Sequence, residues 1–239
     1  MNKTSTFLSE AIFKITADHE CSYLPEKQAR TLFVDPEFPL TMSHYSYLAK
    51  AGFRRSGEHV YRPFCRDCGL CIPVRVPQAS FSPDRSQRRV RKNNQDLVIH
   101  EYAPEYNAAH YQLYRRYMQA RHAGGGMDKD SREDYERLLR ASWSESILLT
   151  YYLDKQLVMV AVTDILDDGL SAVYTFFDPD YPKRSLGVYG ILSQLEQVKA
   201  RQLDYLYLGY WNPQSDKMSY KSRYQPLEFF NGESWQPFE

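Results

Sequence analysis

The sequence predicts an α+β protein with a mixed, mainly antiparallel sheet flanked by helices. Short apolar runs separated by turn residues follow one another over residues 147–177, a pattern typical of a β-meander. An apolar stripe with helical spacing follows over residues 187–202, and a further strand over residues 204–210. The chain has 239 residues, of which 43% are hydrophobic, so it can bury a sizeable core.

The N-terminal third predicts shorter elements. We expect a helix over residues 26–33, because Pro25 suits a first helical turn. A second helix is expected over residues 43–51. Residues 58–63 and 71–81 are predicted strands that enter and leave a cysteine-rich turn.

That turn contains three of the four cysteines of the chain, in the spacing C-x-x-C-x-x-C. Its members are Cys65, Cys68 and Cys71, and Cys21 lies far upstream. Tight turns with this spacing bring thiolates together as Zn²⁺ or an Fe–S cluster requires, so these four residues are the candidate metal ligands. The alternatives are buried small hydrophobic residues or a redox-sensitive cluster.

A basic segment follows and divides the chain. We expect an N-terminal cysteine-containing domain over residues 1–82, a basic junction over 83–104 and a C-terminal domain over 105–239. The arginine density of the junction favours contact with a phosphate backbone, although a solvated surface is the usual explanation for one charge run. Its basic residues are Arg85, Arg88, Arg89, Arg91 and Lys92.

The C-terminal part has clearer periodicity. Helices are predicted over residues 106–122 and from Ser131, which resembles the start of a capping box with Asp134. The glycine-rich turn at residues 124–128 is either a helix end or a wall of an active site. The predicted strands are 147–153, 157–163 and 170–177.

The segment between the third strand and the next helix is the candidate donor-binding loop. The order of three strands, a helix and a strand resembles the core of GNAT-type acyltransferases. Their acyl-donor loop has the pattern R/Q-x-x-G-x-G/A, which Arg184, Gly187 and Gly190 match with the last glycine displaced by one residue. Glycines let backbone N–H groups approach a phosphate, and the helix N-terminus and the arginine add positive charge. Packing of small residues at a helix start is the alternative.

The last predicted strand and its continuation are rich in hydroxyl groups and lysines. Gly209 in mid-strand indicates a bulge or a close approach by another group. In the GNAT fold the acyl acceptor enters beside this strand. The candidate acceptor-binding residues are Lys217, Lys221, Arg75, Tyr207 and Tyr210.

Composition limits the partners. The formal net charge is zero, so any polyanion site is a local patch, and DNA is not an expected partner. No run of about 18 apolar residues is present, so no membrane span is expected. The N-terminus lacks the pattern of a secretory signal, which predicts a cytoplasmic protein.

Several motifs together resemble those of the aminoacyl-tRNA–protein transferases. They are Cys21-Ser22-Tyr23-Leu24-Pro25, Tyr61-Arg62-Pro63 with the cysteine-rich turn, Arg121-His122 with Gly126-Met127, Ala172-Val173-Tyr174-Thr175-Phe176-Phe177 and Lys217-Met218-Ser219-Tyr220-Lys221. The resemblance covers nearly the whole chain and is strongest to the short bacterial form. It implies transfer of leucine from leucyl-tRNA to the N-terminal α-amine of proteins that begin with Asp or Glu, which creates an N-degron for proteolysis.

The resemblance also bears on cofactors. Eukaryotic arginyl relatives use their cysteines for an Fe–S cluster or another metal, so zinc or a cluster is a candidate ligand here. An aminoacyl ester is already activated and needs no cofactor for its transfer to an amine. Two alternatives remain open, a CoA-dependent GNAT N-acyltransferase and a non-catalytic zinc-knuckle RNA-binding protein.

Overall fold

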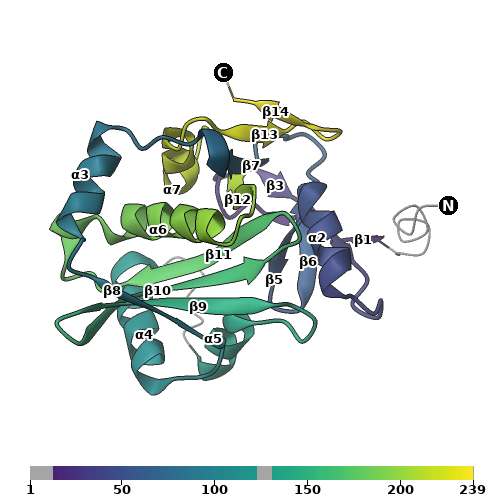
Figure 1. Ribbon diagram of the computed structural model, residues 1–239. Helices are drawn as coiled ribbons and strands as arrows, with labels where there is room; N and C mark the ends of the chain where they lie inside the picture. The colour runs from purple at the N-terminus through teal and green to yellow at the C-terminus, as the bar shows by residue number, and fades with distance from the viewer. Residues whose placement is uncertain (1–12, 123–130, 239) are drawn as a thin grey trace.

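A computed structural model describes residues 13–122 and 131–238. Its largest element is an eight-stranded sheet in the order β14-β13-β7-β12-β11-β10-β9-β8 (Figure 1). Its paired strands are antiparallel except β11 and β12, which are parallel. The strands are β7 (Ile72–Pro77), β8 (Val98–Tyr102), β9 (Ser146–Leu153), β10 (Gln156–Ile165), β11 (Gly169–Phe177), β12 (Tyr205–Trp211), β13 (Glu228–Phe230) and β14 (Trp235–Pro237).

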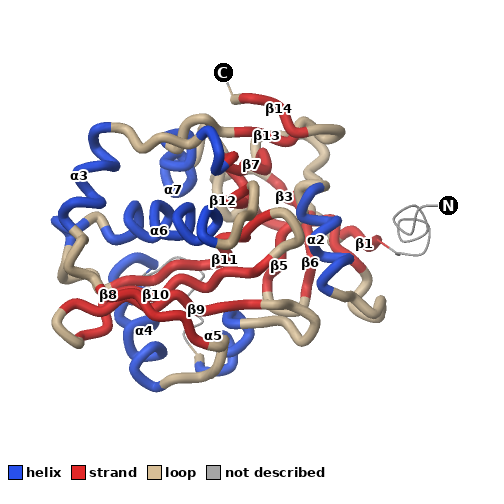
Figure 2. The backbone as a smooth tube through the Cα atoms, in the orientation of Figure 1, coloured by secondary structure: helices blue, strands red, loops and turns tan. Residues whose placement is uncertain are grey.

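Helices cover both faces of the central strands, as Figure 2 shows in blue around the red sheet. Residues alternate between the faces: Met159 and Ala161 pack in the same cluster as Leu186 of α6, and Val160 and Val162 pack with α4 and α5. The helices are α2 (Met42–Lys50), α3 (Arg85–Asn93), α4 (Ala108–His122), α5 (Arg132–Leu139), α6 (Leu186–Ala200) and α7 (Asp216–Ser219), with 3₁₀ turns η1 (Gln78–Ser80), η2 (Pro182–Arg184) and η3 (Tyr220–Arg223).

A smaller sheet lies beside the large one and carries the N-terminal residues (Figure 1). Its strand order is β1-β4-β6-β5, and a separate two-stranded ribbon joins β2 to β3. Helix α2 packs on it through Tyr45 and Leu48, in a cluster that also contains Tyr207 of the large sheet. The strands are β1 (Phe13–Ile15), β2 (His19–Glu20), β3 (Gln28–Ala29), β4 (Thr31–Val34), β5 (Arg54–Ser56) and β6 (His59–Pro63).

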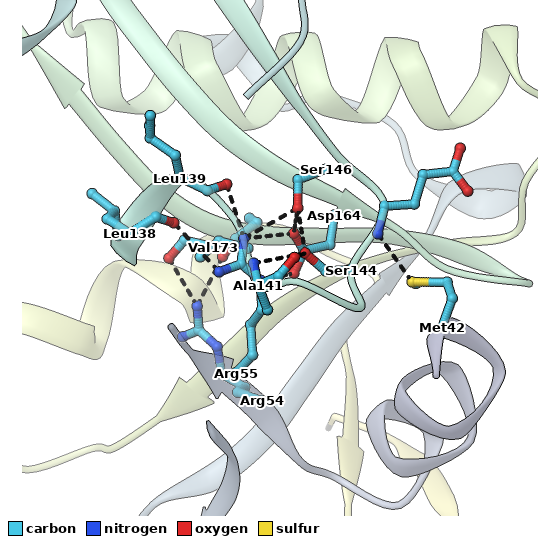
Figure 3. A network of polar contacts seen from close by, with 12 residues as sticks. Met42, Arg54, Arg55, Leu138, Leu139, Ala141, Ser144, Ser146, Asp164 and Val173 are labelled. Carbon is cyan, nitrogen blue, oxygen red and sulfur yellow. Dashed lines mark hydrogen bonds and ion pairs between the residues drawn. The ribbon is translucent and has the colours of Figure 1, made fainter. Parts of the chain in front are cut away.

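Two adjacent residues of β5 connect the sheets (Figure 3). Arg55 forms an ion pair with Asp164 of β10 in which both side chains are fully buried. Its guanidinium also donates to the carbonyl oxygens of Leu138 and Leu139 at the end of α5. Arg54 donates to carbonyl oxygens of β11. The N-terminal sheet is therefore fixed to the strands that follow it by buried polar contacts.

Most predicted elements are confirmed in the described residues. The meander, α6 and β12 lie within two residues of the predicted ranges, and the Ser131 side chain caps α5 by accepting from the Asp134 backbone. The mixed arrangement of antiparallel strands and flanking helices agrees with the expected α+β class. The glycine-rich turn at residues 124–128 lies outside the described residues.

The predicted helix over residues 26–33 is wrong. Thr31 and Phe33 instead pair with Pro63 and Tyr61 of β6, so this segment is a strand of the small sheet. Pairing with a strand about 30 residues away determines its conformation, and local helix signals did not reveal that pairing.

The basic segment expected as a junction contains helix α3. Asp84 and Gln87 form a reciprocal capping box at its start. The preceding strand β7 lies between β12 and β13 in the large sheet. The three-part division of the chain stays a prediction. No helix within the described ranges is long and apolar enough to cross a membrane.

Candidate functional site

The parallel pair β11 and β12 separates after three residue pairs. Gly169–Ser171 pairs with Tyr205–Tyr207, and neither strand pairs with the other beyond these positions. Each strand also has an irregularity near this point. The β10–β11 register shifts at Val173, and the β12–β7 register shifts at Leu208. We call the region beyond Ser171 and Tyr207 the β11–β12 split. Backbone N–H and C=O groups there that have no partner on a neighbouring strand need a different hydrogen-bond partner.

The guanidinium of Arg54 supplies that partner. Its Nη2 donates to the carbonyl oxygens of Ala172 at 2.9 Å and Val173 at 3.0 Å (Figure 3). On the opposite side, a Cβ atom at Gly209 would lie 2.0 Å from Arg54 Nη1. Gly209 also has φ +75°, which favours glycine. The predicted bulge or close approach at Gly209 is confirmed, and the approaching group is Arg54.

A second basic side chain, Lys221, lies near Arg54. Lys221 is buried, and its Nζ donates to the carbonyl oxygen of Tyr210. Burial, with a smaller contribution from Arg54, lowers the pKa of Lys221 well below its usual range. The Tyr210 hydroxyl, in turn, is 3.1 Å from the Gly52 carbonyl oxygen and 3.0 Å from that of Tyr61. The structure therefore brings Tyr210 and Lys221, two of the predicted acceptor-binding residues, next to Arg54.

Aromatic side chains extend from this cluster toward α6. Tyr220 is 39% exposed, yet burial by its neighbours raises its pKa. The ring centre of Tyr117 on α4 lies 6.3 Å from that of Tyr174 and 5.0 Å from that of Phe177, both on β11. The Arg121 guanidinium lies 5.6 Å from the centre of the Phe177 ring. Such surfaces suit ligands with flat rings or apolar side chains.

The first turn of α6 lies against the end of this aromatic surface. A Cβ atom at Gly187 would be 3.1 Å from the Phe177 ring, and one at Gly190 would be 3.3 Å from the Met159 sulfur. Both glycines thus allow α6 to pack closely on the sheet. Ser185 precedes the helix with φ 52°, and no side chain caps its first turn. The N–H groups of a first helical turn favour an anion.

Arg184, the predicted phosphate ligand, already has a carboxylate partner. It forms two hydrogen bonds of 2.8 Å with Asp96, and its side chain is 22% exposed. The hydrogen bond from Arg184 lowers the pKa of Asp96. Asn94 donates to the Arg184 carbonyl oxygen and to that of Val90, each at 2.8 Å. These bonds hold the end of α3 against the start of α6.

Helix α3 exposes the predicted tRNA-binding residues on its surface. Arg88 donates to the Pro83 carbonyl oxygen, and Arg91 forms an ion pair with Glu196 of α6 at 3.0 Å. The exposed basic residues are Arg85, Arg88, Arg89, Arg91 and Lys92. A basic surface thus lies beside the α6 N-terminus, although the chain as a whole has no net charge.

The other predicted acceptor residues form no hydrogen bond with Arg54 among the described residues, although Tyr207 lines a small cavity together with Arg54 and Gly209. Arg75 forms an ion pair with Glu228 at 2.7 Å and stacks 3.5 Å from the Tyr205 ring centre. The Tyr207 hydroxyl lies 3.1 Å from both Arg75 Nη1 and Asp168 Oδ2. These two residues therefore belong to a packed cluster between β7, β12 and β13. Lys217 is exposed on α7.

The four cysteines line one small cavity of about 50 Å³. All four are free thiols, and burial raises the pKa of Cys71 to about 11. Asn212, which follows β12, lies 3.8 Å from the Cys71 sulfur. Four thiols around one cavity are a donor set suited to zinc or an Fe–S cluster. Among the described side chains, however, no three His, Cys, Asp or Glu are arranged to hold a metal ion.

Sequence reasoning missed Arg54 and the aromatic side chains of Tyr117 and Tyr220 as parts of this region. Arg54 contacts residues 118 and 119 positions away, so no local spacing links them. Gly209 was the one available signal, because a glycine in mid-strand indicates that another group approaches the backbone.

Comparisons with known proteins agree with the resemblance in the motifs. Two family models match, "Arginine-tRNA-protein transferase, N terminus" over residues 19–89 and "Arginine-tRNA-protein transferase, C terminus" over residues 109–231. An aspartate/glutamate leucyltransferase of Pseudomonas paraeruginosa is 46% identical over 230 residues, 96% of this chain and 98% of that protein. One of Nitrosococcus oceani is 49% identical over 224 residues, 93% of this chain and 94% of that protein.

A solved structure shows a similar fold. The C-terminal domain of a putative lysylphosphatidylglycerol synthetase from Agrobacterium fabrum superimposes with a TM-score of 0.50 and 14% identity, and the match covers 80% of this chain and 62% of that one. The family assignment rests on the sequence matches, which span nearly the whole chain. This chain belongs to the arginine-tRNA–protein transferase family and matches aspartate/glutamate leucyltransferases over 93–96% of its length.

Proposed function

We propose that this chain transfers leucine from leucyl-tRNA to the N-terminal α-amine of proteins that begin with Asp or Glu. The observation that carries the proposal is the 46–49% identity to aspartate/glutamate leucyltransferases over 93% or more of the chain. The product has a new N-terminal leucine, the signal of an N-degron pathway. Leucyl-tRNA and proteins with an acidic first residue are the partners this activity requires.

The arrangement of β9, β10, β11, α6 and β12 supports a GNAT-like transferase fold. The three antiparallel strands are followed by a helix and by a parallel strand that separates from β11. A sheet opened in this way offers backbone groups and side chains from two strands to an acyl group and an amine. The amine-binding end lies at Arg54, Tyr210 and Lys221, and the acyl-donor end lies at the start of α6.

The chemistry is aminolysis of an ester. The neutral α-amine attacks the leucyl carbonyl carbon, a C–N bond forms, and the ribose oxygen of the tRNA leaves with the proton that the amine gives up. The α-amine has an ordinary pKa of about 8, so a useful fraction is neutral near pH 7. The protein's main contributions are to orient the two substrates and to stabilise the oxyanion. Uncapped N–H groups at the start of α6 are the proposed oxyanion donors.

The exposed basic face of α3 is the proposed binding surface for the tRNA backbone. The Arg91–Glu196 ion pair connects it to α6, and the Asn94 side chain connects it to Arg184 in the turn before α6. The ionic bonds of Arg184 to Asp96 orient the loop before α6, so we propose that Arg184 positions this loop. Gly187 then lets the first turn of α6 lie close to the Phe177 ring.

The cysteine cavity has no step in this reaction. We propose that Cys21, Cys65, Cys68 and Cys71 hold zinc or an Fe–S cluster, which would join the segment around Cys21 to the cysteine-rich turn. Because metal binding to thiolates stabilises a fold, Cys68→Ser should lose both the bound metal and thermal stability. Elemental analysis of anaerobically purified protein measures this. Less than one tenth of an equivalent of zinc or iron in the unmodified protein would contradict the metal proposal.

The transfer activity is tested with radiolabelled leucyl-tRNA and peptides that differ only in the first residue. Label should move to Asp- and Glu-peptides, and acetyl-CoA should not replace leucyl-tRNA as the donor. Binding of tRNA without transfer to any peptide would contradict the proposal.

A further inference from the structure

Arg54 is a half-buried cation that lacks a carboxylate partner among the described residues. Arg54 contacts the neutral carbonyl oxygens of Ala172 and Val173, and Lys221 contacts that of Tyr210. The other arginines at comparable depth differ, because Arg55 pairs with Asp164 and Arg75 pairs with Glu228. A charge that is withdrawn from water without a counter-charge costs free energy. An anion that binds beside Arg54 reduces this cost, so the region favours an anion.

The surroundings of Arg54 suit a residue that binds an incoming ligand, and not only one that supports the two strands. Among the described residues, Arg54 donates hydrogen bonds only through Nη2, whereas a guanidinium has five N–H donors. The side chain keeps partial exposure to solvent, although Tyr45, Tyr61, Tyr210 and Tyr220 surround it. A guanidinium in this state has donor capacity for a carboxylate, which it binds in a directional, often bidentate way.

We propose that Arg54 is the residue that selects an acidic acceptor, by binding the side-chain carboxylate of the first residue. The inference rests on the proposed leucyl transfer and adds the residue that determines its specificity. With the carboxylate at Arg54, the α-amine is directed along the β11–β12 split toward the start of α6. Lys221 holds the carbonyl oxygen of Tyr210 through its Nζ, which fixes the strand beside Arg54.

The other cations from the sequence prediction fit this role less well. Arg75 already has Glu228, Tyr205 and Tyr207 around its guanidinium. Lys217 is exposed to water, where an ion pair is weak. Arg54 combines depth, positive charge and a position between two bulged strands.

The test uses three variants of the full chain, with leucyl-tRNA as donor. Arg54→Gln removes the charge, and Arg54→Lys keeps the charge but not the forked geometry. Arg62→Gln is the matched control. Tyr61 is the strand partner of Arg54, and Arg62 is the next residue, so its side chain projects from the opposite face of the small sheet. The Arg62 guanidinium lies over the Phe53 ring. Transfer is measured as kcat/KM on Asp- and Asn-peptides of otherwise identical sequence, with tRNA affinity as a second readout.

Arg54→Gln should lower kcat/KM for the Asp-peptide by roughly ten- to a hundredfold, the effect of one lost charge-assisted hydrogen-bonded pair. Transfer to the Asn-peptide and affinity for tRNA should change less than threefold, so the preference for Asp over Asn collapses. Arg54→Lys should show an intermediate loss of the same preference, which keeps the test valid if the Gln variant does not fold. Arg62→Gln should keep the preference of the unmodified chain.

Two results would overturn the inference while leaving the leucyl transfer intact. One is an unchanged Asp-to-Asn ratio in the Lys or Gln variant. The other is an equal loss on both peptides, which indicates that Arg54 only supports the two strands. If the unmodified chain itself transfers no leucine, the proposed function fails, and the inference fails with it.

Discussion

Arg55 and Asp164 form a two-bonded ion pair, at 2.6 Å and 2.8 Å, inside the junction between the small sheet and the large one. Ser146 donates to the same carboxylate at 2.6 Å, and two carbonyl oxygens at the end of α5 accept from the guanidinium. The pair lies one residue along β5 from Arg54. The bonds of Arg55 therefore fix the strand that places Arg54 in the β11–β12 split (Figure 3).

Arg55→Met should destabilise the fold by about 3–5 kcal/mol, because Asp164 is then buried without its partner. The double variant Arg55→Met with Asp164→Leu should recover part of that loss. Urea unfolding measures both. The matched control is Arg132→Met, which breaks an ion pair with Glu136 in which both side chains are exposed and should cost less than about 1 kcal/mol. An equal loss of unfolding free energy in the two single variants would contradict the claim that the buried Arg55–Asp164 pair stabilises the fold more than an exposed ion pair does.

Gly209→Ala should reduce both stability and leucine transfer, because its Cβ atom would collide with the Arg54 guanidinium. The control is Gly232→Ala, since Gly232 also has a positive φ, +105°, but nothing lies within 4 Å of its Cβ position. The control isolates the backbone cost of alanine at positive φ, about 1–2 kcal/mol. Thermal unfolding and kcat/KM on an Asp-peptide measure the difference. If both variants lose transfer equally, the collision with Arg54 has no functional effect.

Lys221 should make stability depend on pH in the alkaline range. Burial lowers its pKa in the folded chain, whereas the unfolded chain has the ordinary lysine value of about 10.4. Between these values the unfolded chain binds more protons, so stability rises with pH. The free energy of unfolding of the unmodified chain, relative to Lys221→Met, should therefore increase from neutral pH toward about pH 10.

The exposed Lys217 provides the control for that measurement, because Lys217→Met removes a lysine that stays in water. The difference between this variant and the unmodified chain should be nearly constant with pH. A flat difference for Lys221→Met as well would show that its amine keeps an ordinary affinity for protons.

The basic face of α3 should contribute to the salt dependence of tRNA binding. Replacing Arg85, Arg89 and Lys92 with Gln should weaken binding and reduce the slope of log K against log salt by about 2, for three lost phosphate contacts. A control with the same charge change replaces Arg132, Arg137 and Arg140, at α5 on the opposite face of the sheet. An equal change of slope in both variants would contradict the proposal that α3 is a specific binding surface for tRNA.

The sequence predicted the elements whose signals are local. The turn residues between β9, β10 and β11 and the apolar stripe of α6 lie within the elements they define, and both predictions are confirmed. The segment at residues 26–33 failed because its strand conformation comes from pairing with β6. The capping box of α3 is also a local signal, formed by Asp84 and Gln87 three residues apart.

The site was less predictable for the same reason. Tyr210 and Lys221 were identified, because they lie within a short segment rich in polar residues. Arg54 was not, since its three contacts, at Ala172, Val173 and Gly209, come from strands far along the chain. Arg75 and Tyr207 were expected at the acceptor, and only the structure reveals that they have packed against each other and against Glu228 and Asp168.

Steady-state transfer of leucine to matched peptides tests the central claim most directly. Peptides identical except for a first residue of Asp, Glu, Asn, Gln or Lys are incubated with the protein and leucyl-tRNA. The account predicts efficient leucine addition to the Asp- and Glu-peptides, and kcat/KM values at least about tenfold lower for the other three. Equal leucine addition to all five peptides, or addition to none, would contradict it.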